Sequence, residues 1–336
     1  MKYLNTKGYR IDEVSIVPAE ISLINSRSEC VPFDDNGNYP IFCAPMSVVI
    51  NEKNYDIWKQ NKLIPILPRT VNYEKRIEIL NEGEWVAFGL SEFKHLFIDT
   101  ADSLAKGKTY KVCIDMANGH MKSIYDSVNL AKVLAKDNGY ALIIMTGNIA
   151  NPETYKWIAN NSNVDYVRIN IGTGKVCITS KETGVHFSSG TLLQMCADVK
   201  SYMNGVNCPK IVCDGGIHSY ADINVALAMG ADYVMLGSML AALDESAAYK
   251  TENGECLYYG MSTEIAQKHI DMASENAKDS KFKYKVEEGI AIHIKRNGSV
   301  ISWIRKFDAY LRSAMSYTNC KTLRSFTSGY VMTMVK

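Results

Sequence analysis

The sequence predicts an α/β fold, namely a closed (β/α)8 TIM barrel with an N-terminal extension and a C-terminal flap and helical segment. Two observations lead to it. Eight short apolar runs recur along the chain, and each is continuous rather than alternating, as in parallel strands buried on both faces. Helix-like stretches separate most of them, which is the repeat of a barrel. An open doubly wound sheet is the alternative that the pattern allows. The runs are residues 41–46, 63–67, 85–90, 111–115, 141–146, 166–170, 210–214 and 233–237.

The intervening stretches have helical character. Pro152 followed by Glu153 is typical of the first turn of a helix. The helix-like stretches are residues 52–60, 73–80, 125–135, 152–159 and 221–229. A barrel carries its active-site groups just past the C-terminal ends of its strands, and the densest glycine usage of the chain falls on those loops.

The length of 336 residues fits a single barrel domain over residues 1–336 with additions at both ends. Residues 1–40 form an N-terminal lead. We expect a mobile flap within residues 250–300, because residues 270–285 are rich in Lys, Ser and Asp and poor in large apolar side chains. Helical periodicity returns over residues 301–315.

Charge and composition exclude several classes of protein. Lys and Arg total 37 and Asp and Glu total 36, so nothing indicates a nucleic-acid or membrane partner. No apolar run approaches the ~18 residues of a membrane helix, and residues 1–16 lack the apolar core of a signal peptide, so we expect a cytoplasmic protein. The nine cysteines contain no CxxC pair and the six histidines no HExxH spacing, which argues against zinc.

One cysteine differs from the others in its setting. Cys177 lies in a glycine-containing loop after the sixth run, between Gly174 and Thr179. A thiol at the mouth of a barrel is partly exposed and could act as a nucleophile, with the Thr179 hydroxyl relaying protons. A packed loop residue is the equally simple structural alternative. The loop is not a dinucleotide fingerprint, because cysteine stands where the third glycine is needed.

Two further loops have the form of a phosphate cup. Asp214-Gly215-Gly216 and Gly237-Ser238 end the seventh and eighth runs, where backbone amides of a barrel commonly bind phosphate. An aspartate before the glycines can accept hydrogen bonds from ribose hydroxyls, so the pair indicates a nucleoside monophosphate or sugar phosphate. The structural alternative for these two loops is a pair of tight turns. Asp115, which ends the fourth run, could be catalytic or binding but could equally cap a helix, and the adjacent carboxylates of Glu287 and Glu288 could simply be solvated.

Taken in this order, the loops resemble the IMP dehydrogenase/GMP reductase family, nearly from end to end. The motifs that carry the resemblance are Ser26-Arg27-Ser28-Glu29-Cys30, Ala44-Pro45-Met46, Asp115-Met116-Ala117-Asn118-Gly119, Gly147-Asn148-Ile149-Ala150, the cysteine loop over residues 172–184, Asp214-Gly215-Gly216-Ile217, Met235-Leu236-Gly237-Ser238, Tyr259-Gly260-Met261-Ser262 and Leu311-Arg312-Ser313.

Within that family, four features favour the reductase. Only residues 68–84 separate the second and third runs, where dehydrogenases usually carry a pair of CBS modules. Residues 241–295 contain no arginine, whereas the dehydrogenase flap supplies an Arg–Tyr pair that activates water. The motif at residues 26–29 and the loop at residues 115–119 are also closer to the reductase form. The resemblance therefore implies NADPH-dependent reductive deamination of GMP to IMP and ammonia, through a covalent bond from Cys177 to C2 of the purine.

The resemblance also implies a role for each matching position. Cys177, Thr179 and Glu288 would be catalytic. Substrate would be bound by Asp214, Gly215, Gly216, Gly237, Ser238, Tyr259, Gly260, Met261, Lys285, Val286, Glu287 and Gly289. The cofactor would be bound by Ser26, Arg27, Arg69, Asp115, Met116, Ala117, Ile171, Gly172, Tyr284, Ser313, Ala314, Met315 and Ser316. A monovalent cation such as potassium would be held by Gly172, Gly174, Cys177 and Ser180. A homotetramer with the cofactor site near a subunit boundary is the assembly that the family implies.

The chain also departs from the family at several positions. Thr173 and Lys175 stand where Pro and Ser are common, and Pro68-Arg69 stands where His-Lys or His-Arg is expected. Gly237-Ser238 is a form shared with dehydrogenases. The alternatives are an IMP dehydrogenase lacking CBS modules, a divergent homologue acting on a related purine nucleotide, and a nucleotide-binding barrel without catalysis.

Overall fold

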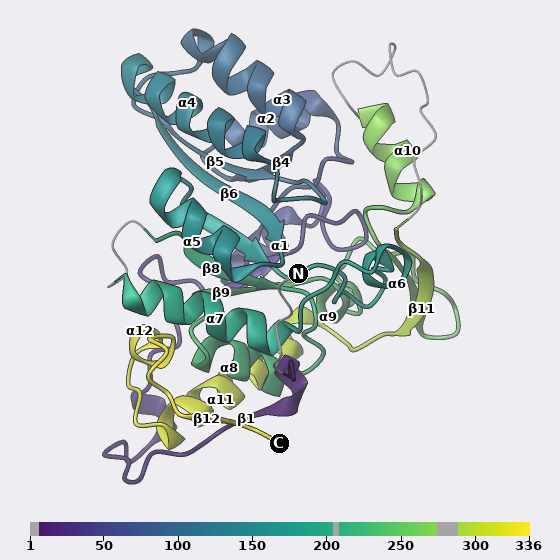
Figure 1. Cartoon of the computed structure of the whole chain (residues 1–336). Coiled ribbons are helices and arrows are strands. Elements are labelled where there is room, and N and C mark those ends of the chain that lie inside the picture. The colour runs from purple at the N-terminus through teal and green to yellow at the C-terminus, as the bar shows by residue number, and fades with distance from the viewer. Residues whose placement is uncertain (1–6, 204–207, 274–287) are drawn as a thin grey trace.

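The computed structural model describes residues 7–203, 208–273 and 288–336 and confirms the barrel. Eight parallel strands form one sheet in the order β3-β2-β9-β8-β7-β6-β5-β4 (Figure 1). Leu67, just after β3, closes the ring through a parallel bridge to Val86 of β4. Each predicted run overlaps one strand, although β5 begins before its run and β6 ends after its run. The strands are β2 (Ile41–Cys43), β3 (Ile64–Pro65), β4 (Trp85–Phe88), β5 (Thr109–Ile114), β6 (Ala141–Ile149), β7 (Tyr166–Ile169), β8 (Lys210–Asp214) and β9 (Tyr233–Leu236).

Helices connect the strands and cover the outside of the barrel. Asn151 caps the fifth helix by accepting a hydrogen bond from the backbone of Glu153, and Pro152 follows it, as the sequence predicts. The connecting helices are α1 (Tyr55–Gln60), α2 (Tyr73–Asn81), α3 (Leu90–Lys94), α4 (Lys122–Asn138), α5 (Pro152–Asn161), α6 (Thr179–Thr183), α7 (Ser189–Tyr202), α8 (Tyr220–Ala228) and α9 (Ser238–Ala241), with short turns η3 (His95–Asp99) and η4 (Ala101–Ser103).

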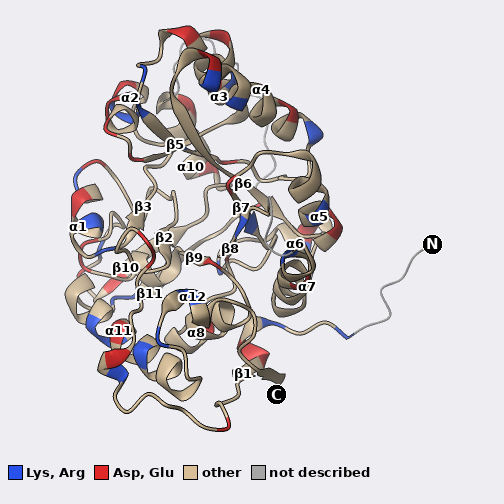
Figure 2. Cartoon of the chain, turned by 90° about the vertical axis from the view of Figure 1, so that its left-hand side faces the viewer, with Lys and Arg blue, Asp and Glu red and all other residues tan. Residues whose placement is uncertain are grey.

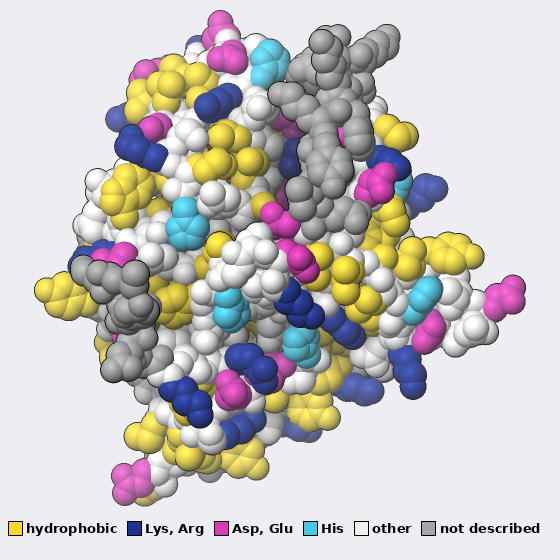
Figure 3. Space-filling model, turned by 45° about the vertical axis from the view of Figure 1, so that its right-hand side comes forward, with side chains coloured by type: hydrophobic (Ala, Val, Ile, Leu, Met, Phe, Trp, Pro, Cys, Tyr) yellow, Lys and Arg dark blue, Asp and Glu magenta, His cyan; other side chains and the backbone are white. Residues whose placement is uncertain are grey.

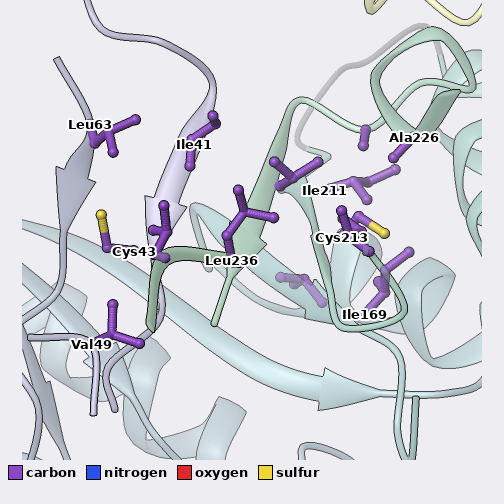
Figure 4. Close-up of a cluster of buried hydrophobic side chains, with 14 of the residues drawn as sticks. Ile41, Cys43, Val49, Leu63, Ile169, Ile211, Cys213, Ala226 and Leu236 are labelled. Carbon is purple, nitrogen blue, oxygen red and sulfur yellow. The ribbon is translucent and has the colours of Figure 1, made fainter. Parts of the chain in front are cut away.

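The core has two layers because side chains alternate between the two faces of each strand. The outer layer packs strands against helices; Figure 4 shows Ile169, Ile211 and Ala226 of β7, β8 and α8 within it. The inner layer fills the barrel. Its members are Phe42, Ala44, Ile66, Trp85, Ala87, Cys113, Met145, Val212, Tyr233 and Met235. Phe42, Trp85 and Tyr233 are among them, so the end of the barrel where the strands begin is packed with aromatic rings.

The additions at both ends of the chain meet on one side of the barrel. β1 (Val14–Ile16) pairs antiparallel with β12 (Thr333–Val335), and η2 (Arg27–Glu29) packs against α11 (Val300–Tyr317). The remaining elements are η1 (Ile11–Glu13) and α12 (Leu323–Phe326). After the barrel, β10 (Glu255–Tyr259) and β11 (Ala291–Lys295) form an antiparallel pair, with α10 (Glu264–Ala273) between them in sequence. Residues 250–300, where the sequence predicts a flap, therefore contain β10, α10 and β11, and residues 274–287 of that range lie outside the described residues.

The surface carries both signs of charge close together. Figure 2 shows Lys and Arg positions interspersed with Asp and Glu along the ribbon, and Figure 3 shows side chains of both signs over the face drawn. Within the described residues, no helix combines the length and apolar character that crossing a bilayer requires.

Candidate active site

A cavity of about 420 Å³ opens where the barrel strands end. Its walls come from the segments that the sequence singles out, including Cys177 of the cysteine loop, Asp214 at the end of β8 and Gly237 after β9. Because all eight strands run in the same direction, their C-terminal loops meet at this end of the barrel. The fold thus brings together residues that lie far apart in the chain.

Three side chains in the cavity wall form a continuous hydrogen-bonded series. The thiol of Cys177 donates to the Thr179 hydroxyl at 3.3 Å, and that hydroxyl donates to Oε2 of Glu288 at 2.5 Å. Cys177 is partly exposed to the cavity. Every proton donor in the series points toward the carboxylate, so the arrangement can move a proton from sulfur to Glu288 and return it by the same route.

Backbone pairing brings Glu288 to the cysteine loop. Cys177 and Gly289 form an antiparallel bridge, Ile178 donates its N–H to the Glu288 carbonyl at 2.9 Å, and Ile290 donates to the Val176 carbonyl at 3.0 Å. The segment that leads into β11 is therefore attached to the cysteine loop as a short strand. Local sequence alone contains no signal for this pairing, because the partners lie more than a hundred residues apart.

The two glycine loops are closely packed, Gly215 against the cysteine loop and Gly237 against Tyr258 and Met46. Gly215 has φ +89°, and a Cβ there would lie 2.6 Å from the Thr173 hydroxyl. A Cβ on Gly237 would lie 2.7 Å from the Tyr258 hydroxyl. A Cβ would crowd both positions, and at Gly215 the positive φ also favours glycine.

The cavity wall also contains a charged cluster in which Arg168 is buried and Asp115 and Asp214 are half-buried. Asp115 accepts a hydrogen bond from Nη2 of Arg168 at 3.0 Å, and Nη1 of the same guanidinium lies 3.8 Å from Oδ2 of Asp214. Asn148 donates to Oδ2 of Asp214 at 2.8 Å. Burial raises the pKa of Asp214, while the Arg168 charge and the Asn148 hydrogen bond act to lower it. Asp115 is an ion-pair partner here and not a helix cap, since α4 begins at Lys122.

Other thiols have quite different surroundings. Burial raises the pKa of Cys113 and of Cys213 to about 12, and it holds that of Cys43 well above its ordinary value. These thiols stay protonated at neutral pH, as the sequence predicts for small core residues. Cys208 is also partly exposed, but it precedes β8 and so lies toward the opposite end of the barrel.

Comparison with known proteins identifies the family. Residues 84–335 match the sequence profile of the IMP dehydrogenase/GMP reductase domain. The chain belongs to the IMP dehydrogenase/GMP reductase family. The resemblance drawn from the loop motifs is thereby confirmed.

Similar curated proteins bear the name GMP reductase. One from Yersinia enterocolitica is 32% identical over 252 residues, which cover 70% of this chain and 68% of the relative. One from Mycoplasma mycoides subsp. mycoides is 28% identical over 335 residues and 95% of each chain. A third, from Lactococcus lactis subsp. cremoris, is 28% identical over 325 residues, 94% of this chain and 92% of the relative.

Most positions carried over from the family lie around the cavity. The cavity wall includes Arg69, Asp115, Met116, Ala117, Ile171, Gly172, Gly174, Cys177, Thr179, Asp214, Gly215, Gly216, Gly237, Ser238, Gly260, Met261 and Glu288. Gly289 lies directly behind it as the partner of Cys177. Tyr259 is buried on β10, where its hydroxyl accepts a hydrogen bond from Ser47. Tyr284, Lys285, Val286 and Glu287 lie outside the described residues.

The rest of the family's cofactor positions lie elsewhere on the chain. Ser26 and Arg27 are at η2, and Ser313, Ala314, Met315 and Ser316 are in the second half of α11, which η2 contacts. None of them lines the cavity. The predicted cofactor residues that the structure describes therefore form two groups on the chain, one beside Cys177 and one at η2 and α11.

The predicted cation ligands are already engaged within the loop. The Gly172 carbonyl accepts a hydrogen bond from the Ser180 hydroxyl at 3.1 Å, and the Gly174 carbonyl accepts one from the Cys177 N–H at 3.0 Å. Each carbonyl oxygen keeps a second lone pair, so the donor set still suits a hard monovalent cation. The described residues contain no group of three or more His, Cys, Asp or Glu placed to hold a metal ion.

Sequence reasoning missed several wall residues, among them Arg168, Asn170, Tyr258 and Gln267. A signal was available for Arg168, because a strand reading Tyr-Val-Arg-Ile places one charged residue inside an apolar run. Asn170 directly follows the same strand. Tyr258 and Gln267 reach the wall through the placement of β10 and α10, which the local sequence does not specify.

Proposed function

We propose that the protein is a GMP reductase that uses NADPH to convert GMP to IMP and ammonia through a covalent bond between Cys177 and C2 of the purine. The observation that carries the proposal is the Cys177–Thr179–Glu288 series at the cavity. It supplies a nucleophile and a proton relay in one place, and the family's glycine loops lie beside it.

The relay accounts for both halves of the deamination. As the proton of Cys177 passes through Thr179 to Glu288, the sulfur becomes a thiolate and attacks C2. The bond from C2 to the amino nitrogen then breaks, and that nitrogen keeps the electron pair. Glu288 returns the proton through Thr179, so the nitrogen leaves as ammonia and not as an amide anion.

The reduced nicotinamide supplies the hydride that replaces sulfur on C2 and releases the Cys177 thiolate. Arg69, Asp115 and Gly172 would hold the nicotinamide half, since they line the cavity next to the cysteine loop. Arg69 already donates to the Asp115 carbonyl at 3.3 Å, which braces this wall.

The other cofactor positions support a multimeric enzyme. We infer that Ser26, Arg27 and residues 313–316 contact the distal half of the cofactor from a neighbouring subunit, because in their own subunit they lie outside the cavity wall. A homotetramer, the assembly that the family implies, would supply that neighbour. Analytical ultracentrifugation checks this, and a monomer with full activity would contradict it.

A second bound group, a monovalent cation such as potassium, would suit the carbonyls of Gly172, Gly174 and Cys177 and the hydroxyl of Ser180, which are hard oxygen donors. It would stiffen the loop that presents the thiol. Comparing GMP affinity in potassium and in tetramethylammonium buffers checks this, since the second cation is too large for such a site.

The deciding experiment compares two reactions of the purified chain. Incubation with GMP and NADPH should yield IMP and ammonia in equal amounts, whereas incubation with IMP, NAD and potassium should yield no XMP. XMP formation would favour the dehydrogenase. Failure to form any covalent purine adduct, measured by mass spectrometry of the denatured protein, would leave only a nucleotide-binding role.

A further inference from the structure

The strongest feature that the mechanism does not use is the side chain of Arg168. It lies on β7 inside the barrel, with 5% of its side chain exposed. Its neighbours Val167 and Ile169 face the outer layer, so strand alternation turns Arg168 inward. A Cβ on Gly147 would lie 2.7 Å from the Arg168 Cβ, and glycine there makes room for the larger side chain.

Arg168 forms the floor of the cavity together with two carboxylates. Cys113 and Val212 belong to the inner apolar layer. Asp115 and Asp214 lie two residues after them along the chain, so their side chains point to the same inner side of the barrel. Three charged side chains thus lie one level above that layer. The guanidinium is the positive charge between two negative ones, since it contacts Asp115 at 3.0 Å and Asp214 at 3.8 Å.

Each carboxylate keeps one oxygen for a ligand. The contacts of Asp115 with Arg168 use Oδ1, and the contacts of Asp214 with Arg168 and Asn148 use Oδ2. Within the described part of the chain, no hydrogen bond or ion pair reaches the other oxygen of either group, and both residues line the cavity. Arg168 and Asn148 therefore fix which oxygen of Asp214 is turned to the ligand.

We propose that Arg168 is a positioning residue that aims Asp214 at the nucleotide ribose and Asp115 at the cofactor, and so couples the binding of the two ligands. The inference rests on the proposed function, because it takes its two ligands from there. A guanidinium shared by two carboxylates is ordered by whichever ligand binds first, so the second ligand meets an arranged site.

The test compares the full-length wild type with R168K, which keeps the charge but loses the planar fork. Dissociation constants are measured by calorimetry for GMP and its 2′,3′-dideoxy analogue, each with and without oxidised NADP. Every protein in this comparison also carries C177A, so that no covalent adduct forms, and oxidised NADP has no hydride to give. We expect R168K to weaken GMP binding about tenfold and the dideoxy analogue much less. Without R168K, oxidised NADP should lower the dissociation constant of GMP several-fold. In R168K the ratio of the GMP dissociation constants without and with oxidised NADP should approach one.

Two further variants keep the inference falsifiable. K200Q breaks a half-buried ion pair to Asp232 beside the N-terminal end of β8, away from the cavity, and should leave both quantities unchanged. N148A removes the other group that holds Oδ2 of Asp214 without touching Asp115, so it should reduce ribose preference and retain cofactor coupling. Melting temperatures without ligand check that each variant folds.

The contrary outcomes are distinct. The inference would be overturned, with the proposed function intact, if R168K weakened the binding of GMP and of its dideoxy analogue by the same factor. It would also be overturned if N148A kept the full wild-type preference for GMP over the dideoxy analogue. Equal binding of GMP and its dideoxy analogue by the wild type would also overturn the inference and leave the proposed function intact. A wild type that binds neither GMP nor NADP would refute the proposed function and this inference with it.

Discussion

Replacing Glu288 with glutamine separates the two chemical steps of the proposed reaction. Glutamine has the shape of glutamate, and its carbonyl oxygen can still accept the Thr179 hydrogen bond, but it cannot take up or return a proton. The two contacts of 3.3 and 2.5 Å leave no gap in the series, so the whole proton-transfer contribution should be lost. That contribution is typically about 10²–10⁴-fold, and deamination should slow by this factor.

Hydride transfer should slow far less than deamination in the same variant, because only the loss of the Cys177 proton involves Glu288 in that step, whereas departing ammonia must also receive a proton. It can be followed in reverse by mixing enzyme with IMP and oxidised NADP and recording formation of the reduced nicotinamide, while deamination is followed as ammonia in a single turnover with GMP. E182Q is the matched control, because Glu182 is an exposed carboxylate on neighbouring α6. Equal slowing of both steps in E288Q, or slowing in E182Q, would refute the relay.

Four further outcomes follow from the site and the fold. C177A should have no measurable turnover and form no covalent adduct, yet bind GMP with nearly the wild-type dissociation constant; appreciable steady-state activity would contradict this. Burial is the main cause of the raised pKa of Asp214, and its carboxylate is protonated as pH falls through that raised pKa. The ratio of KM for dideoxy-GMP to KM for GMP should therefore decrease in the wild type as pH is lowered. In D214N this ratio should be low at every pH. Lys175 lines the cavity and has no carboxylate partner among the described residues, so K175S should raise KM for GMP about two- to fivefold without changing kcat, and the difference should shrink at high salt. G230A should destabilise the fold by about 1–3 kcal/mol more than G254A in urea titrations, because both glycines have positive φ but only Gly230 would place a Cβ, 2.9 Å from that of Ala197, in a packed contact.

Much of the barrel could be predicted from the sequence because its strands are buried on both faces. That burial leaves continuous apolar runs in the sequence, and each of the eight runs overlaps a strand. The ends of the strands are less certain from sequence, since several runs continue as loop; the first run spans residues 41–46, but β2 ends at Cys43. Hydrogen bonding to both neighbours decides where a strand ends, and a single segment does not reveal it.

The site could be predicted where its residues are local, as in the loop of Cys177 and Thr179. Glu288 entered only through resemblance to the family, because a pairing between residues that far apart leaves no pattern in either segment. Arg168 was missed even though its charge stands out in an apolar strand. Arg168 is neutralised by Asp115 and Asp214 only because the ends of three strands lie close together in the barrel. The apolar periodicity of one strand does not reveal which residues of the other strands lie beside it.

The bridge between Cys177 and Gly289 has a consequence for how the protein is made. The ribosome completes the last barrel strand at Leu236 before it reaches Glu288. During synthesis the barrel can therefore close around a thiol that still lacks its carboxylate partner. Reactivity is assembled last, when the later segment returns to form two backbone hydrogen bonds with a scaffold that is already in place.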